Sequence, residues 1–255
     1  MRKAVVVKHQ AIQDDLIYDF GVHKGYDTEF YLKKGFRVLG LEAVPELYNA
    51  AVENISAFGT RATLINKALY HRAGETVSFF TVPNKDDWGS LDRNIAEKGV
   101  ETAVEIEVQT VDLMTLFETY GTPYYLKCDM EGGDLIMREQ LLSCVQRPRF
   151  VSIEMNDGNE PDILIKCGYE VGQIVNQWFN PFKTPPKPPR EGSFVEAQFT
   201  GEMSGLFGRE LDPAKWRPLS EIADIYRQWH TLRALDQELA PGWLDLHVCR
   251  AAALA

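Results

Sequence analysis

Residues 16–46, LIYDFGVHKGYDTEFYLKKGFRVLGLEAVPE, decide the fold of this 255-residue chain. An apolar run at 16–20 stops at Gly21, and a segment with helical spacing then closes at Gly35. A second apolar run, 36–43, shows almost no polar alternation, as expected for a parallel strand that is covered on both faces. This order of strand, turn, helix and strand predicts a βαβ unit of a parallel sheet.

The pattern continues outward from this unit. Pro45 begins a predicted helix that ends at Gly59, and a third strand is expected at 62–69. Two further strand-like segments, 75–82 and 102–111, flank a polar stretch. We expect them to form a β-hairpin insertion at the edge of the sheet or over its top. The first 70 residues already predict a doubly wound α/β fold.

The second half of the chain is predicted to complete one domain that spans residues 1–255, with a cofactor-binding core at about 16–156. Strands are expected near 124–129, 149–157, 169–177 and 243–251, and helices at 112–121, 161–168 and 219–235. The region 177–215 is rich in proline and glycine, which is typical of a stiff, extended loop. We expect this loop to lie over the upper rim of the sheet, on the substrate side.

Composition limits the partners of the protein. A formal net charge of −10 argues against nucleic acid and anionic membranes, because phosphate binding needs clustered Lys and Arg, and it favours a small-molecule substrate. The four cysteines show no zinc spacing and are interpreted as reduced thiols. Neither a signal peptide nor a membrane-spanning stretch is evident, so we expect a cytoplasmic protein. A homodimer is compatible with the sequence.

The loop after the first strand and the end of the second strand carry the sharpest functional signal. Gly21 and Gly25 follow Asp19 with GxxxG spacing, unlike the GxGxxG of dinucleotide sites, so the expected cofactor lacks a pyrophosphate at this loop. Glu42 ends the second strand, where a carboxylate can accept hydrogen bonds from ribose hydroxyls. Taken alone, the two glycines could be a chance pair, and Glu42 could be an ordinary solvated acid after a strand. Together they indicate a nucleoside cofactor.

Several ordered motifs give the chain a resemblance to the FkbM-type S-adenosylmethionine-dependent methyltransferases. The resemblance covers about residues 17–156 and rests on DFGVHKGYDT, RVLGLEAVPE, INKALYHRAGETVSFF, WGSLD, VQTVDL, YYLKCDMEGGD and SIEMN. It implies a class I, Rossmann-like sheet that is mostly parallel and has an antiparallel final strand. It also implies that S-adenosyl-L-methionine is bound by the following residues: Asp19, Gly21, Gly25, Glu42, Ala43, Asn66, Ala68, Ser90 and Asp129.

The same resemblance places Lys127, Asp129 and Glu131, from the KxDxEG pattern, near the transferring methyl group. His23 is a candidate general base because its ordinary pKa lies near neutrality, although it fits equally well as a residue that stabilises its own loop. Glu154 completes the catalytic candidates. No divalent metal is expected, but Asp129, Glu131, Glu154 and Asn156 end neighbouring strands and form an alternative set of oxygen ligands.

These observations predict an S-adenosylmethionine-dependent methyltransferase that methylates a hydroxyl group of a small molecule, such as a sugar or a secondary-metabolite scaffold. Two alternatives stay open at this point. One is an NAD-dependent oxidoreductase on the same type of sheet, which the missing GxGxxG disfavours. The other is a catalytically silent S-adenosyl-binding or scaffold protein.

Overall fold

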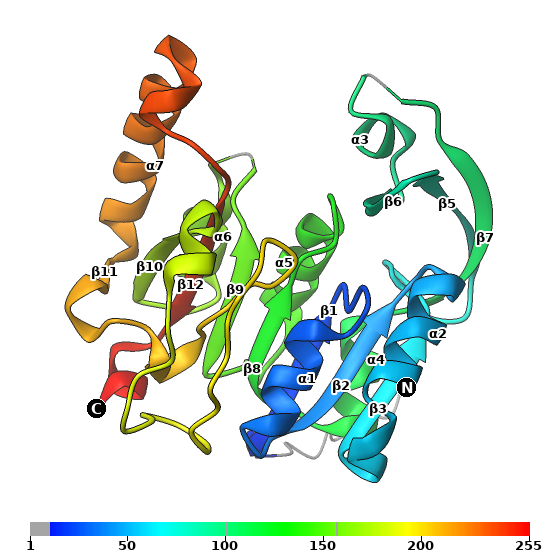
Figure 1. Ribbon diagram of the computed structural model, residues 1–255, viewed down its shortest axis with the longest axis horizontal. Helices are drawn as coiled ribbons and strands as arrows, with labels where there is room; N and C mark the ends of the chain where they lie inside the picture. The colour runs from blue at the N-terminus through cyan, green and yellow to red at the C-terminus, as the bar shows by residue number, and fades with distance from the viewer. Residues whose placement is uncertain (1–10, 100, 157) are drawn as a thin grey trace, which may run out of the picture.

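A computed structural model describes residues 11–99, 101–156 and 158–255. The expectation that the chain starts without a signal peptide concerns residues 1–10, which lie outside the described residues. The main sheet has the strand order β11-β10-β12-β9-β8-β1-β2-β3 (Figure 1). The strands have these bounds: β1 Gln13–Phe20, β2 Arg37–Glu42, β3 Ala62–Asn66, β8 Pro123–Cys128, β9 Phe150–Glu154, β10 Val171–Asn176, β11 Arg217–Pro218 and β12 Leu244–Cys249.

The chain winds in two directions from the centre of this sheet. β1 pairs in parallel with β2 on one side and with β8 on the other, while β12 runs antiparallel between β9 and β10. The predicted α/β class, the mostly parallel sheet and the antiparallel final strand are therefore confirmed. The winding reverses between β1 and β8, and ligands of open α/β sheets bind at the carboxyl ends of the strands at such a point.

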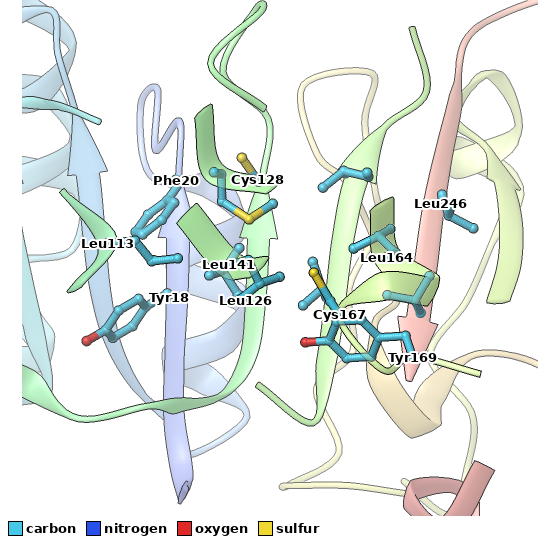
Figure 2. Packing of buried hydrophobic residues seen from close by; sticks show 14 of the residues in the cluster. Tyr18, Phe20, Leu113, Leu126, Cys128, Leu141, Leu164, Cys167, Tyr169 and Leu246 are labelled. Carbon is cyan, nitrogen blue, oxygen red and sulfur yellow. The ribbon is translucent and has the colours of Figure 1, made fainter. Parts of the chain in front are cut away.

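Seven helices accompany the sheets within the described residues: α1 Tyr26–Lys33, α2 Pro45–Asn54, α3 Arg93–Glu97, α4 Leu113–Tyr120, α5 Asp134–Ser143, α6 Glu160–Lys166 and α7 Leu219–Leu235. Helices α4 to α7 pack their apolar side chains on one face of the main sheet. In Figure 2, Tyr18, Phe20 and Leu126 from the strands meet Leu113 and Leu141 from this helical layer.

The other face of the main sheet is covered by α1, by residues around Ile55 and by the segment 183–215. Phe199 and Phe207 of that segment are buried against Phe30 and Tyr31 of α1. The expected position over the upper rim is therefore wrong for most of the segment. Its aromatic residues supply apolar area that a helix supplies elsewhere. Within the predicted region 177–215, Gln177 and residues 201–204 line the cavity.

A second, four-stranded sheet has the order β4-β7-β5-β6 and stands with α3 beyond the upper ends of β1 and β2 in Figure 1. Its strands are β4 Ala68–Leu69, β5 Thr76–Val82, β6 Lys85–Ser90 and β7 Val104–Val111. The predicted hairpin is thus part of a larger unit, because 85–90 is a strand too. The predicted strand 62–69 is divided between the two sheets: Ala68 pairs with Thr110 instead of continuing β3.

Candidate active site

A cavity of about 550 Å³ opens at the carboxyl ends of β1, β2, β8 and β9 and at the amino end of the antiparallel strand β12. The small sheet forms one wall through Phe79, Gly89 and Leu91, and residues 201–204 form part of another. The cavity lies at the topological switch point of the main sheet, and its volume is in the range of small-molecule sites.

One end of the cavity is apolar and narrow. Its wall includes Val44 and Leu47 at the start of α2, Ala68 of β4, and Phe79 and Leu91 of the small sheet. Nearby Gly89 is required for this packing, because a Cβ there would lie 2.8 Å from the ring of Phe79. This end can accept a flat heterocycle such as adenine, and Ala43 and Ala68 lie on its wall where the sequence places them.

Glu42 lies on the cavity wall at the end of β2 and is only 7% exposed. Its Oε2 accepts a hydrogen bond from the backbone N–H of His23 at 2.8 Å, and its Oε1 accepts one from that of Val44 at 2.9 Å. Burial raises the pKa of Glu42 to about 7. His23 adopts a φ of 54°, a strained conformation that places its N–H against this carboxylate. The loop thereby holds Glu42 in place, with lone pairs left for a ligand.

Asn66 supports the backbone at Glu42 through hydrogen bonds. Its amide nitrogen donates to the backbone oxygens of Glu42 and Ala43, at 2.9 and 3.1 Å. Asn66 itself does not form part of the cavity wall, so it supports the position of Glu42 without lining the cavity.

Gly21 and Gly25 have different tasks in the loop after β1. A Cβ on Gly21 would lie 1.8 Å from the carbonyl oxygen of Asp129, so only glycine allows the tips of β1 and β8 to approach. Gly21 lines the cavity. Gly25 is the left-handed N-cap of α1 and packs near Ala51 of α2, away from the cavity wall.

Asp19 is completely buried and also lies off the cavity wall. Its Oδ1 is 3.2 Å from Nζ of Lys127, and its Oδ2 accepts a 2.5 Å hydrogen bond from Thr28 of α1. Lys127 is also 3.4 Å from Asp27 and donates to the Gly21 carbonyl at 3.1 Å. Burial works against the charge of Lys127, but the neighbouring Asp residues hold its pKa well above the ordinary value. Lys127 is therefore a fixed cation.

The other end of the cavity is acidic. Asp129 after β8, Glu154 at the end of β9 and Asp245 in β12 converge there. Burial, reinforced by Asp129 and Glu131, raises the pKa of Glu154 to about 8. Burial also holds the pKa of Asp245 well above its ordinary range. The Asp129 side chain is 52% exposed and so is the most solvated of the three.

The remaining catalytic candidates face other partners. Glu131 lies on the wall but its Oε1 is 2.8 Å from Nζ of Lys98. The Nε2 of His23 is 3.4 Å from Asp86 of β6. Ser90 is off the wall, where its hydroxyl donates to the Glu131 carbonyl at 2.7 Å. It braces the loop after β8 against the small sheet.

Three members of the alternative metal set, Asp129, Glu131 and Glu154, line the cavity, but Asn156 does not. The backbone N–H of Asn156 donates to Glu160 at 2.7 Å. Across residues 11–99, 101–156 and 158–255, no three His, Cys, Asp or Glu side chains are arranged to hold a metal ion.

Three wall residues were not expected at the site from the sequence: Asp86, Trp243 and Asp245. Gln177 and residues 201–204 belong to the region expected on the substrate side, but they were not singled out individually. Asp245 had a detectable signal, since it is an acidic residue inside the apolar run WLDLHVC. The others lie in loops or a polar strand that only the tertiary fold brings to the cavity. In total, the wall has nine Asp or Glu residues and three Lys residues. This excess suits a ligand that carries positive charges, as the sulfonium and ammonium groups of S-adenosylmethionine do.

Comparison with known proteins agrees with this geometry. Residues 19–174 match the family described as the methyltransferase FkbM domain. The chain therefore belongs to the FkbM family of S-adenosylmethionine-dependent methyltransferases and is an enzyme of that class, which sets the oxidoreductase and silent-scaffold alternatives aside. No curated protein sequence matches it significantly.

Two solved structures show distant similarity of fold. Precorrin-6y C5,15-methyltransferase from Geobacter metallireducens GS-15 is 11% identical, with a TM-score of 0.42, over 95% of this chain and 83% of that one. A TehB-like SAM-dependent methyltransferase from Corynebacterium glutamicum is also 11% identical, with a TM-score of 0.34, over 74% and 77% of the two chains. Within the described residues, the helices are too short or too polar to cross a membrane.

Proposed function

We propose that this methyltransferase methylates a hydroxyl group of a small polar molecule and that Glu154 removes the hydroxyl proton. The observation that carries the proposal is the position of Glu154 at the acidic end of the cavity, with a pKa raised to about 8. A general base is most effective when its pKa lies near the working pH, because it then combines basicity with a sufficient deprotonated fraction.

The cofactor would occupy the cavity between Glu42 and the tips of β1 and β8. Glu42 would hold the ribose, Ala43, Ala68 and Phe79 the base, and Gly21 and Asp129 the amino-acid end. When bound, S-adenosylmethionine supplies a methyl group on a positively charged sulfur. The acidic wall would balance that charge and leave space for the acceptor beside Glu154.

The proton balance and the existing contacts favour Glu154 over Lys127, Glu131, His23 and Asp245. An acceptor hydroxyl that gains a methyl group loses its proton, and the departing sulfur becomes a neutral thioether. Lys127 cannot take that proton because its ammonium is already held by Asp19 and Asp27. Glu131 is engaged by Lys98, and His23 faces Asp86. Asp245 is a secondary candidate, but Gln177 donates a hydrogen bond to its Oδ2.

A radiolabelled methyl-transfer assay tests the proposal. The protein is incubated with methyl-labelled S-adenosylmethionine and a panel of alcohols, phenols, saccharides and primary amines. We expect label on hydroxyl compounds, and a kcat that falls ~100- to 10,000-fold in Glu154→Gln. The affinity for S-adenosylhomocysteine should stay within about twofold, because Glu154 lies outside the nucleoside end. Label on amines alone, or an unchanged kcat in the variant, contradicts the proposal.

A further inference from the structure

Four large aromatic side chains are exposed on the two segments that contribute Gln177 and Trp243 to the cavity wall. Trp178 is 57% exposed, Phe179 48%, Phe182 81% and Trp243 41%. Trp178, Phe179 and Phe182 belong to the short 3-10 helix Gln177–Phe182, which follows β10, and Trp243 precedes β12. Single exposed apolar residues need no explanation, but a group of them at the mouth of a binding cavity marks an interaction surface.

This aromatic group is continuous with the active-site cavity. Gln177 and Trp243 both line the cavity, and the backbone N–H of Gln177 donates to the Trp243 carbonyl at 2.9 Å. Trp178 packs directly on the Trp243 loop, because a Cβ on Gly242 would lie 2.6 Å from the Cβ of Trp178. Trp178 therefore lies next to the loop that contributes Trp243 to the cavity wall.

A buried polar network holds the aromatic segment rigid. Gln177 is 3% exposed and donates to Asp245, while Asn180 is fully buried and donates to Gln177. Asn180 also donates to the Met203 carbonyl at 2.7 Å, which ties the segment to the 201–204 wall. Asn176 fixes the start of the segment by accepting from the Trp178 N–H at 3.0 Å and donating to the Pro241 carbonyl at 2.8 Å. The aromatic side chains are thus exposed on a fixed base.

We propose that Trp178, Phe182 and Trp243 form a subsite for an apolar part of the methyl acceptor, which extends out of the cavity from the hydroxyl held at Glu154. This inference rests on the proposed function. Its expected ligand is an amphiphile, in which a hydroxylated head occupies the acidic end and an alkyl or aromatic group covers the exposed rings. The segment 177–182 itself carries no charged residue, and the net charge of −10 disfavours an anionic membrane as the occupant.

Binding of matched glycosides tests the subsite without requiring turnover. Methyl and octyl β-D-glucoside, the latter below its micelle concentration, are titrated into the protein saturated with S-adenosylhomocysteine. The probes share one hydroxylated head and differ only in the tail. We expect octyl glucoside to bind ~10-fold more tightly than methyl glucoside to the unmodified protein, because its chain buries apolar area on the rings.

The ratio of the Kd for methyl glucoside to the Kd for octyl glucoside should fall toward one in the double variant Trp178→Ser/Phe182→Ser. The ratio should stay unchanged in Val145→Ser. Val145 is 70% exposed and lies in the connection between α5 and β9, outside the cavity wall. Both proteins should keep the S-adenosylhomocysteine affinity of the unmodified chain, which verifies folding. An octyl preference that is absent from the unmodified protein, or equal in the two variants, overturns the inference. So does binding to phosphatidylcholine vesicles that only the double variant loses, since the patch would then serve a membrane.

The two proposals fail in distinguishable ways. If label appears only on amines while the octyl preference is lost on removal of the rings, the subsite stands and the hydroxyl acceptor is wrong. If hydroxyl compounds are methylated but the tail has no effect, the subsite is wrong and the function of Glu154 is unaffected.

Discussion

Lys127 and Asp19 form a buried ion pair at paired positions of adjacent parallel strands, with Nζ 3.2 Å from Oδ1. Asp27 of α1 lies 3.4 Å from the same ammonium. The three charges connect β8, β1 and α1 at the cavity, whose wall includes Lys127 and Asp27. Because Asp19 and Asp27 hold its ammonium, the lysine of the KxDxEG pattern fixes the geometry of the strand tips.

Replacing Lys127 with Met should lower the free energy of unfolding by about 3–5 kcal/mol, because Asp19 and Asp27 would be left as uncompensated buried charges. Urea unfolding at pH 7 measures the effect, and Lys166→Met on the exposed end of α6 is the control. A variant with unchanged stability and lost turnover would instead assign Lys127 a direct role in proton transfer.

A second buried pair joins the 183–215 segment to the main fold. Nζ of Lys34 lies 2.5 Å from Oε1 of Glu210, both side chains are 0% exposed, and Lys34 also donates to the Ser193 carbonyl at 3.1 Å. Lys34→Met should cost about 3–5 kcal/mol, and adding Glu210→Leu should restore most of the loss. Thermal unfolding of the single and double variants provides the comparison. Equal destabilisation of both would show that the ion pair itself, and not the unpaired charge, sets the stability.

The raised pKa of Glu154 predicts a pH dependence of stability. The unfolded carboxyl group loses its proton near pH 4.5, whereas the folded one keeps it up to about pH 8. Between these values the folded state binds more protons, so the free energy of unfolding decreases as pH rises. Glu154→Gln should gain roughly 3 kcal/mol relative to the unmodified protein between pH 5 and pH 8. Glu53→Gln, on the exposed face of α2, is the control, and parallel pH profiles for Glu154→Gln and the unmodified protein would contradict the shift.

The sequence predicted the parallel sheet and the position of Glu42 at the end of β2 because both depend on local signals. The apolar runs 16–20 and 36–43 and the intervening glycines determine β1, α1, β2 and the position of Glu42. Asp129 and Glu154 of the acidic end were also expected at neighbouring strand ends, but Asp245 was not. Asp245 meets Glu154 only because β12 inserts between β9 and β10, a long-range pairing with no local signal. Asp19 looked like a cofactor ligand, but its burial beside Lys127 is a tertiary effect.

Three segments meet above the cavity at Lys24. Its Nζ lies 2.7 Å from Asp86 of β6 and 3.9 Å from Glu202 of the 201–204 wall. Exposed ion pairs contribute roughly 0–1 kcal/mol, so Asp86→Asn should leave stability nearly unchanged. We expect S-adenosylhomocysteine to dissociate several-fold faster in stopped-flow displacement, because the contact bridges opposite walls. Asp87→Asn, on the same strand and wall, is the matched control. Equal rates of S-adenosylhomocysteine release from Asp86→Asn and Asp87→Asn would show that the Lys24–Asp86 contact does not control release.

Calorimetric titration of S-adenosylhomocysteine into Glu42→Ala tests the central claim that the tips of β1 and β2 hold the adenosyl group. At pH 8 the Glu42 carboxyl, whose pKa is about 7, is mostly ionised. Loss of a charge-assisted acceptor should weaken binding by about 1.5–3 kcal/mol, or roughly 10- to 150-fold. Glu46→Ala, exposed on α2, should bind like the unmodified chain. An unchanged Kd in Glu42→Ala, with the fold intact, would contradict this account of the site.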